Sequence, residues 1–449
     1  MTETVDCREL ALGILMEVTR QEEYSHIAIR NVLEKYQYLG KSERAFLTRL
    51  TEGTLEWMIR LDYIINQFSN VKVNKMKPVI RNILRMSVYQ LEFMNSVPAS
   101  AVCNEAVKLA VKKGFRGLKG FVNGVLRNIA RNISQIVYPD RTDTLTYLSV
   151  MYSVPEWIVE DWLSVYGAET VEKMLQAFLK KEPIAIRPNL ERITPEELKE
   201  RLEQQGIEVT KAEWPDYALR IGKYNYLGAI PEFRDGLFQV QDVSSMMVVE
   251  AADPREGSFC IDVCAAPGGK SIHLAEKLHG TGCVEARDLT DYKTGLIQEN
   301  AARSGVKNLR ILKWDACVTH EDSCGKADLV LADLPCSGLG VLNKKTDLKY
   351  RMTREQQKDL VRLQREILKT VQAYVKPGGT LIYSTCTINQ EENEKNVDWF
   401  LKQFPFEAVS LEDCLPKTLK GGTASRGYLQ FLPGLHASDG FFIAKFRRN

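Results

Sequence analysis

The feature that most constrains the fold of this chain is a regular alternation of short apolar strands and longer helical segments that begins near residue 236. Helical periodicity fills the gaps between strands, for example at 270–278 and 290–304. This alternation predicts a doubly wound, Rossmann-like α/β domain with a mostly parallel sheet. Two further strands, near 406–410 and 441–446, could form a hairpin at one edge. The five expected core strands are 259–264, 282–287, 309–314, 327–332 and 379–384.

A glycine-containing loop follows the first of these strands. Ligands of such sheets bind at the carboxyl ends of the strands, where the segment Asp262-Val-Cys-Ala-Ala-Pro-Gly-Gly-Lys270 lies. Its two glycines let the backbone approach a ligand closely, and the following helix offers an N-terminus that attracts a carboxylate or phosphate. The spacing is neither G-x-G-x-x-G nor that of a P-loop, which disfavours a dinucleotide and argues against a nucleotide triphosphatase.

Acidic residues end the next two strands. Asp288 comes 20 residues after Gly268, where an acid that binds a ribose belongs. Glu285 is a weaker candidate because it lies in the middle of the strand. Asp315 follows the third strand and is placed to meet the exocyclic amine of adenine. Each acid alone is equally typical of a helix cap, but with the glycine loop they predict a nucleoside site, and S-adenosylmethionine fits it best.

Two cysteines follow the fourth and fifth strands. The fourth runs into Asp333-Leu-Pro-Cys336-Ser-Gly and the fifth into Ser384-Thr-Cys386-Thr. A single cysteine is usually a core residue, but two at the mouths of neighbouring strands indicate thiol chemistry. A thiolate is an effective nucleophile for covalent catalysis. From the residues alone, either Cys336 or Cys386 could be that nucleophile.

The rest of the chain divides into two further regions. Apolar residues at three- and four-residue spacing predict an all-helical domain over 1–140, and shorter mixed elements predict a small α+β module over 145–230. The α/β domain then covers 231–449. The ten cysteines include no C-x-x-C pair, which makes a zinc site or a disulfide framework improbable. No basic leader precedes the first apolar stretch, and no apolar run approaches the ~18 residues of a membrane span. We therefore expect a cytoplasmic protein with reduced thiols and no membrane contact.

Charge is distributed unevenly along a chain of net charge +2. Residues 1–140 contain 20 basic and 14 acidic side chains, and residues 72–131 contain 12 and 2. Such a basic face predicts binding to a polyanion, most simply RNA, although a solvated helical surface is the alternative. The candidate RNA-binding residues are Lys108, Lys112, Lys113, Arg116, Lys119 and Arg127, with Arg187 in the middle module.

The motifs around Asp262, Cys336 and Cys386 resemble the signature of the RNA cytosine-C5 methyltransferases of the NOL1/NOP2/Sun family, over about 230–449. The N-terminal region resembles the antitermination factor NusB in Ala101-Val-Cys-Asn-Glu-Ala-Val-Lys-Leu-Ala and Phe121-Val-Asn-Gly-Val-Leu-Arg. Together they resemble bacterial enzymes that methylate 16S ribosomal RNA, free or in a small-subunit assembly particle.

The resemblance implies roles for particular residues. Cys386 would be the nucleophile and Cys336 would assist product release. From the chemistry of the base, we also expect Asp333 to face the cytosine ring and Pro335 to stiffen the loop. One departure is the stretch 342–350, where Lys345 and Thr346 stand in place of an expected Arg-x-x-Pro-Asp pattern; another is Pro188, where family members more often have valine. The residues implied to line the S-adenosylmethionine site are Cys264, Ala265, Ala266, Pro267, Gly268, Gly269, Lys270, Asp288, Asp315 and Asp333.

Three other interpretations stay open from the sequence. An adenine or guanine N-methyltransferase would need no cysteine and usually carries an Asn/Asp-Pro-Pro-aromatic loop after the fourth strand. A non-catalytic RNA-binding scaffold would not need an intact cofactor loop. The same chemistry could act on transfer RNA or DNA, because the catalytic motifs do not identify the polymer. No long hydrophobic stripe argues for a dimer, so we expect a monomer.

Overall fold

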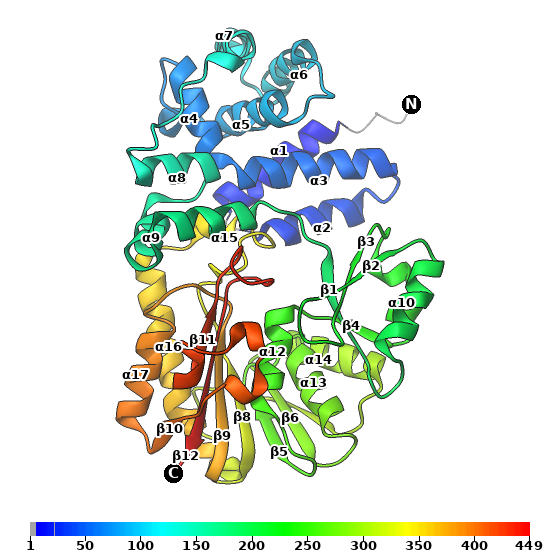
Figure 1. Ribbon diagram of the computed structural model, residues 1–449. Helices are drawn as coiled ribbons and strands as arrows, with labels where there is room; N and C mark the ends of the chain where they lie inside the picture. Colours follow the sequence, from blue (N-terminus) through cyan, green and yellow to red (C-terminus); the bar gives the residue numbers. More distant parts are fainter. Residues whose placement is uncertain (1–5, 22) are drawn as a thin grey trace. The chain divides into compact units, whose positions relative to one another are not determined.

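The computed structural model describes residues 6–21 and 23–449 (Figure 1). The chain forms two compact units, one made of Met1–Leu179 with Leu342–Arg351 and the other of Lys180–Val341 with Met352–Asn449. The acidic opening of the chain, at 1–5, lies outside the described residues. Among the described helices, none combines the length and the apolar character needed to cross a membrane.

The first unit is all-helical, as predicted for its N-terminal part. Its N-terminal helix α1 is capped by the Asp6 side chain, which accepts the Arg8 N–H. Helix α9 is interrupted at Gly167, whose φ of +74° breaks the helical backbone. The helices are α1 (Cys7–Arg20), α2 (Ser25–Lys35), α3 (Lys41–Glu56), α4 (Met58–Phe68), α5 (Pro78–Phe93), α6 (Ala99–Lys112), α7 (Lys119–Arg131), α8 (Thr144–Tyr152), α9 (Glu156–Phe178) and α15 (Leu348–Arg351).

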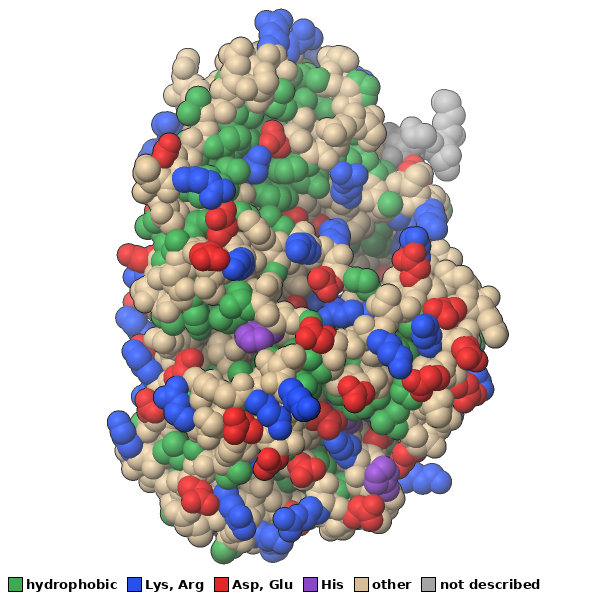
Figure 2. Space-filling model, in the orientation of Figure 1, with side chains coloured by type: hydrophobic (Ala, Val, Ile, Leu, Met, Phe, Trp, Pro, Cys, Tyr) green, Lys and Arg blue, Asp and Glu red, His purple; other side chains and the backbone are tan. Residues whose placement is uncertain are grey.

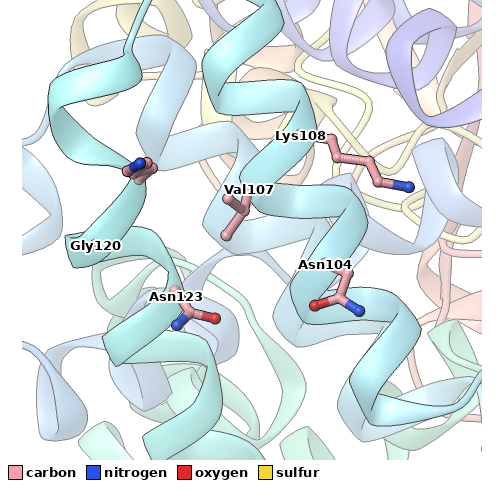
Figure 3. A pocket seen from close by; sticks show the side chains of 6 residues that line it. Asn104, Val107, Lys108, Gly120 and Asn123 are labelled. Atoms are coloured by element: carbon pink, nitrogen blue, oxygen red, sulfur yellow. The ribbon is translucent and has the colours of Figure 1, made fainter.

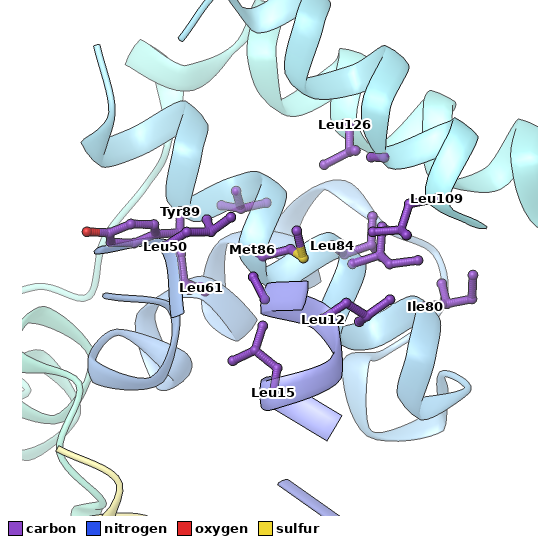
Figure 4. Packing of buried hydrophobic residues seen from close by; sticks show 14 of the residues in the cluster. Leu12, Leu15, Leu50, Leu61, Ile80, Leu84, Met86, Tyr89, Leu109 and Leu126 are labelled. Carbon is purple, nitrogen blue, oxygen red and sulfur yellow. The ribbon is translucent and has the colours of Figure 1, made fainter. Parts of the chain in front are cut away.

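Helix α5 carries much of the core of this unit (Figure 4). Its residues Ile80, Leu84 and Met86 are almost fully buried. Tyr89, also on α5, packs over Gly53 of α3 so closely that a Cβ there would lie 2.0 Å from the ring. Burial of these apolar faces, rather than helix propensity, stabilises the unit.

The segment Leu342–Arg351 returns to the helical unit only six residues after Cys336 in the chain. Asp347 accepts hydrogen bonds from the backbone N–H and hydroxyl of Ser25, the latter at 2.6 Å. The Lys349 ammonium donates to the carbonyl oxygen of Glu56 at 2.8 Å. This short segment, the one in which the sequence departs from the family pattern, is therefore an integral part of the helical unit.

The second unit begins with a small four-stranded antiparallel sheet of order β2-β3-β1-β4. The chain order β1–α10–β2–β3–α11–β4 with this strand order is a ferredoxin-like arrangement. The predicted module at 145–230 thus spans both units, because α8 and α9 pack with the helical unit. The strands are β1 (Ile184–Pro188), β2 (Glu208–Lys211), β3 (Leu219–Gly222) and β4 (Phe238–Val240), and the helices are α10 (Pro195–Gln204) and α11 (Pro231–Arg234).

The predicted doubly wound domain is present, with an eight-stranded sheet of order β10-β12-β9-β8-β5-β6-β7 and β11 paired to β12. Strands β5 to β9 are parallel. The two predicted edge strands, β10 and β12, do pair with each other, and β12 also pairs with β9. Strand β11, which pairs with β12, was not predicted. The strands are β5 (Phe259–Asp262), β6 (Cys283–Asp288), β7 (Leu309–Lys313), β8 (Ala327–Asp333), β9 (Val375–Thr385), β10 (Phe406–Ala408), β11 (Tyr428–Phe431) and β12 (Phe441–Arg448). The helices are α12 (Val243–Ala252), α13 (Gly269–Lys277), α14 (Asp291–Ser304), α16 (Arg354–Val371) and α17 (Glu394–Gln403).

Candidate active site

The glycine loop connects the end of β5 to the start of α13. Gly268 has a φ of +102°, and a Cβ at this position would lie 3.2 Å from Ile297 of α14, so the turn requires glycine. The loop is fixed by the Ala265 N–H, which donates to the Arg287 carbonyl, and by the Asn300 side chain, which donates to the carbonyl of Pro267. The loop therefore leads directly into the N-terminus of α13, where free backbone N–H groups attract an anionic group.

Asp288, at the end of β6, lies directly against this loop. One carboxylate oxygen accepts the N–H of Ala266 at 2.9 Å, and the other accepts the N–H of Leu289 and faces Lys293 at 2.9 Å. A carboxylate offers about four acceptor positions, so it retains capacity for a ribose hydroxyl. The competing acid, Glu285, is instead bound by the guanidinium of Arg287. The arrangement fits a nucleoside ligand held by main-chain groups and one acid.

Asp262 and Cys264 lie at the start of the same loop, where Asp262 is buried and Cys264 is half-buried. Burial raises the pKa of the Cys264 thiol well above its ordinary value, which keeps it protonated. Burial also raises the pKa of Asp262 to about 7, although its hydrogen bond from Ser271 opposes that shift. These groups support the loop from within the protein.

A lysine–aspartate pair joins the glycine loop to the fourth strand. The Lys270 ammonium lies 2.6 Å from Oδ2 of Asp333, and Oδ1 accepts the hydroxyl of Ser384 at 2.7 Å. Asp333 and Ser384 are register partners in β8 and β9, which explains why the hydroxyl reaches the carboxylate. Burial alone would lower the pKa of Lys270, but Asp333 and other nearby anionic groups, including Cys386, raise it overall.

The two predicted cysteines lie side by side at the ends of these neighbouring strands. Their sulfur atoms are 3.4 Å apart, within hydrogen-bond distance for thiols. The hydrogen bond with Cys386, burial and the charge of Glu392 together raise the pKa of Cys336 well above its ordinary value. Pro335 lies exposed beside them, and its carbonyl accepts a hydrogen bond from Gln364 of α16.

Sequence reasoning missed three side chains behind the cysteines. Ser337 and Thr387, which directly follow Cys336 and Cys386, have hydroxyls 2.6 Å apart, and Ser337 also donates to the buried carboxylate of Glu392. Glu392 belongs to a run of acidic and amide residues that resembles an exposed polar turn, and its neighbour Glu391 is indeed exposed. Nothing in the local sequence distinguishes the buried acid from the exposed one.

Comparison with known proteins identifies the family. Residues 249–447 match the family model described as 16S rRNA methyltransferase RsmB/F, residues 6–131 match the NusB family, and residues 154–225 match an RsmF/B-like ferredoxin-like domain. A probable ribosomal RNA small subunit methyltransferase B of Bacillus subtilis is 36% identical over 444 residues, which cover 98% of both proteins. The chain belongs to the RsmB/F family of 16S rRNA methyltransferases.

Two solved structures are similar in fold to this chain. The crystal structure of PH0851 matches 99% of both chains with a TM-score of 0.82 and 27% identity. A methyltransferase homologue from Pyrococcus horikoshii covers 68% of this chain and 99% of its own, with a TM-score of 0.60 and 27% identity. The predicted fold is therefore confirmed. The predicted methyl donor, S-adenosylmethionine, agrees with membership of this methyltransferase family.

Two of the predicted site residues lie away from these contacts. Asp315 follows β7 and is exposed, and its carboxylate accepts the N–H of Cys317 at 2.9 Å. Its contact with adenine stays a prediction. Arg187 is only 1% exposed, because its guanidinium pairs with the buried Glu276 and donates to Gln241 at 2.6 Å. The prediction that Arg187 contacts RNA is wrong, since β1 packs this side chain inside the protein.

The candidate RNA-binding side chains of the NusB-like region are exposed, as RNA binding would require, and they are Lys108, Lys112, Lys113, Arg116, Lys119 and Arg127. Arg85, in the same basic stretch, is instead buried and pairs with Asp62. Lys and Arg side chains are visible on the molecular surface in Figure 2. A groove of about 440 Å³ lies between α6 and α7 in this unit, with Lys108 and Lys119 on its walls (Figure 3). The balance of charge is less extreme than the sequence indicates, because Glu9 of α1 pairs with Lys112 at 2.6 Å and with Lys113 at 2.7 Å. This compensating acid lies outside the basic stretch and is brought to it by the fold.

Proposed function

We propose that this RsmB/F protein transfers a methyl group from S-adenosylmethionine to C5 of a cytosine in 16S ribosomal RNA, with Cys386 as the nucleophile. One observation carries this proposal: the sulfurs of Cys336 and Cys386 lie 3.4 Å apart, beside the Lys270–Asp333 pair and at the strand ends that also carry the glycine loop. An N-methyltransferase on the same fold would have no use for two adjacent thiols.

The chemistry requires an activated cytosine. S-adenosylmethionine, when bound, supplies an electrophilic methyl group. The Cys386 thiolate adds to C6 of the base, which makes C5 electron-rich enough to take that methyl group. Loss of the C5 proton to a base then breaks the bond between sulfur and C6 and returns the thiolate. Asp333 would face the ring edge of the cytosine between these steps.

The electrostatics favour Cys386 as the charged member of the thiol pair. A negative charge on Cys386 would raise the pKa of Lys270, so a Cys386 thiolate formed in the reaction would have the Lys270 ammonium as a favourable neighbour. The raised pKa of Cys336 keeps its own proton in place, so that its thiol can donate a hydrogen bond to Cys386. Cys336 is then the group beside the adduct that assists product release.

The substrate must present an accessible base. A cytosine in a stacked helix cannot meet a thiolate and a methyl group together, so the target is unpaired or flipped out. The exposed basic side chains of the NusB-like region would hold neighbouring phosphates of the RNA, which supplies affinity without selecting a base. Base selection would fall to the loops that follow β8 and β9, which carry Pro335 and Cys386.

The decisive experiment is transfer of labelled methyl from S-adenosylmethionine to protein-free small-subunit ribosomal RNA, followed by identification of the product nucleoside. We expect 5-methylcytidine with the wild type and none with Cys386→Ser, which should still bind S-adenosylmethionine. Cys283 lies at the start of β6, at the end of the strand away from Asp288, so Cys283→Ser is the matched control and should stay active. A methylated purine, or comparable turnover by Cys386→Ser, would overturn the proposal. No incorporation at all would contradict free ribosomal RNA as the substrate and favour assembled particles or transfer RNA.

A further inference from the structure

The backbone is held on both sides of Cys336. On the preceding side, the Gln364 side chain donates to the carbonyl of Pro335 at 2.9 Å. On the following side, the N–H of Ser337 donates to Oε2 of Glu392 at 2.9 Å. Gln364 also donates to Oε2 of Glu392 at 3.0 Å, so the two clamps are themselves connected. Cys336 therefore lies on a loop that is fixed immediately before and after the thiol.

Glu392 also connects this loop to the one that carries Cys386. The Ser337 hydroxyl donates to Oε1 of Glu392 at 2.5 Å and lies 2.6 Å from the Thr387 hydroxyl. Since the single Ser337 proton is used on the carboxylate, the Thr387 hydroxyl is the donor in the second contact. A continuous chain of hydrogen bonds thus runs from Glu392 through Ser337 to the residue that follows Cys386.

Stability alone gives little reason for a carboxylate at this position. Glu392 is 0% exposed, and hydrogen bonds only partly recover the desolvation cost of a buried charge. Burial accordingly raises the pKa of Glu392, against the three donated hydrogen bonds that lower it. All three of those donors hold the Cys336 loop, either directly from Ser337 or through Gln364.

We propose that Glu392 is the positioning residue that fixes the thiol of Cys336 against the thiol of Cys386. The inference rests on the proposed cysteine chemistry for its functional meaning, but the spacing of the two sulfurs can be tested separately. Glu392 touches neither thiol and acts through Ser337 and Thr387. If its role is geometric, a neutral side chain of the same shape will replace it and a truncated one will not.

The first test probes spacing without RNA. Phenylarsine oxide condenses with two adjacent thiols, forming two arsenic–sulfur bonds and releasing one water. Wild-type protein should bind it tightly, and Cys336→Ala and Cys386→Ser should each lose that affinity. We expect Glu392→Ala to weaken binding about tenfold or more, since the loop is released, whereas Glu392→Gln should stay near the wild type. The exposed neighbour variant Glu391→Ala is the matched control.

The Glu392→Gln variant is informative because a glutamine side chain can form a hydrogen bond with each partner of Glu392. Its carbonyl oxygen accepts from the Ser337 N–H and from Gln364, and its amide donates to the Ser337 hydroxyl, which then donates to Thr387. A Glu392→Gln protein as defective as Glu392→Ala would show that charge, not position, matters and would overturn the inference. Unchanged arsenical binding by a folded Glu392→Ala would overturn it as well. If Glu392→Ala fails to fold, Ser337→Ala removes the hydroxyl link alone and should show the same loss.

The second test uses turnover on small-subunit ribosomal RNA. Under the proposed function, Cys336→Ala accumulates a covalent adduct of RNA and protein on a denaturing gel, and Glu392→Ala should accumulate it too, with turnover reduced about 10²-fold and S-adenosylmethionine binding retained. Adduct in Cys336→Ala but not in Glu392→Ala would contradict the inference and leave the proposed function intact. Adduct in neither variant, with altered arsenical binding in Glu392→Ala, would contradict the cysteine mechanism and leave the positioning intact.

Discussion

The Lys270 ammonium lies 2.6 Å from Oδ2 of Asp333, and this ion pair joins the cofactor loop to the strand that leads to Cys336. Both side chains are largely withdrawn from solvent, with 13% and 27% of their surfaces exposed. The pair thus sits between the predicted binding site of the methyl donor and the two thiols. A lysine at the start of α13 can in this way influence chemistry at the ends of β8 and β9.

Replacement of Lys270 by methionine should reduce methyl transfer by about 10²-fold or more, because the Asp333 carboxylate loses its counter-charge and Cys386 loses a positive neighbour. Single-turnover transfer of labelled methyl to ribosomal RNA measures the effect. Lys270→Arg keeps the charge and should recover part of the rate. A Lys270→Met protein that transfers methyl at the wild-type rate would restrict the pair to a structural role.

The ion pairs of Glu9 allow the basic surface to be tested with one variant that should strengthen RNA binding and another that should weaken it. Glu9→Gln releases Lys112 and Lys113 from their carboxylate partner, so RNA should bind more tightly and the salt dependence of binding should steepen by about one phosphate contact. Lys119→Gln, in the groove between α6 and α7, should weaken binding and flatten that dependence by a similar amount. Affinities measured at several salt concentrations give both slopes.

Opposite shifts in these two variants would be difficult to obtain by altered folding, because each changes one exposed or half-exposed side chain. The salt slope of Glu9→Gln is the sharper of the two measurements. If neither slope changes, the surface formed by α6 and α7 is a solvated helical face and RNA binds elsewhere.

Arg187 provides a stability prediction instead of a binding prediction. Removal of one member of a buried ion pair leaves an uncompensated charge, so Arg187→Met should lower the free energy of unfolding by about 3–5 kcal/mol through the stranded Glu276. The salt dependence of RNA binding should stay unchanged below the melting temperature. Thermal melts and binding titrations check the two statements. A weaker salt dependence of RNA binding in Arg187→Met would show that Arg187 does contact RNA.

Much of the fold was predictable because the period of the apolar pattern changes along the chain. Helical spacing dominates the region before Arg131, and strand–helix alternation dominates the region after 236. The boundary between the middle module and the helical unit was less accessible, since α8 and α9 join the helices through tertiary packing that no local pattern records. Strand β11 is only four residues long and pairs with β12 alone, so its sequence signal is weak.

The site was predictable where the topology of a parallel sheet brings strand ends together. This rule alone places Asp288 by the glycine loop and Cys336 beside Cys386. The rule does not indicate which charged side chains will be buried. For this reason Glu392 was not predicted as a site residue, and the buried Arg187 was predicted to contact RNA. Burial of a charged side chain depends on partners far away in sequence, such as Glu276 for Arg187 and Ser337 for Glu392.

The segment Leu342–Arg351 contains a titratable group that reports on the helical unit. Lys349 is 4% exposed, and burial lowers its pKa to about 7, with the charge of Glu56 opposing the shift. In the unfolded chain the pKa of the same group is about 10.4, so above pH 7 the unfolded state binds more protons than the folded one. This group therefore makes the folded protein more stable as the pH rises from 7 toward 10, by at most about 2 kcal/mol between pH 7 and 8.5.

Lys349→Met should remove that dependence. The variant should melt at a higher temperature than the wild type near pH 7, because no buried ammonium must be desolvated, and the difference should shrink as the pH approaches 9. The Glu56 carbonyl keeps a partner in the variant, since the Tyr350 hydroxyl lies 3.0 Å away. Tyr350→Phe is the matched control: burial raises the pKa of Tyr350 above this range, so its removal should lower the melting temperature by a similar amount at each pH. Parallel melting curves for wild type and Lys349→Met across pH 7 to 9 would contradict the assignment of this dependence to Lys349.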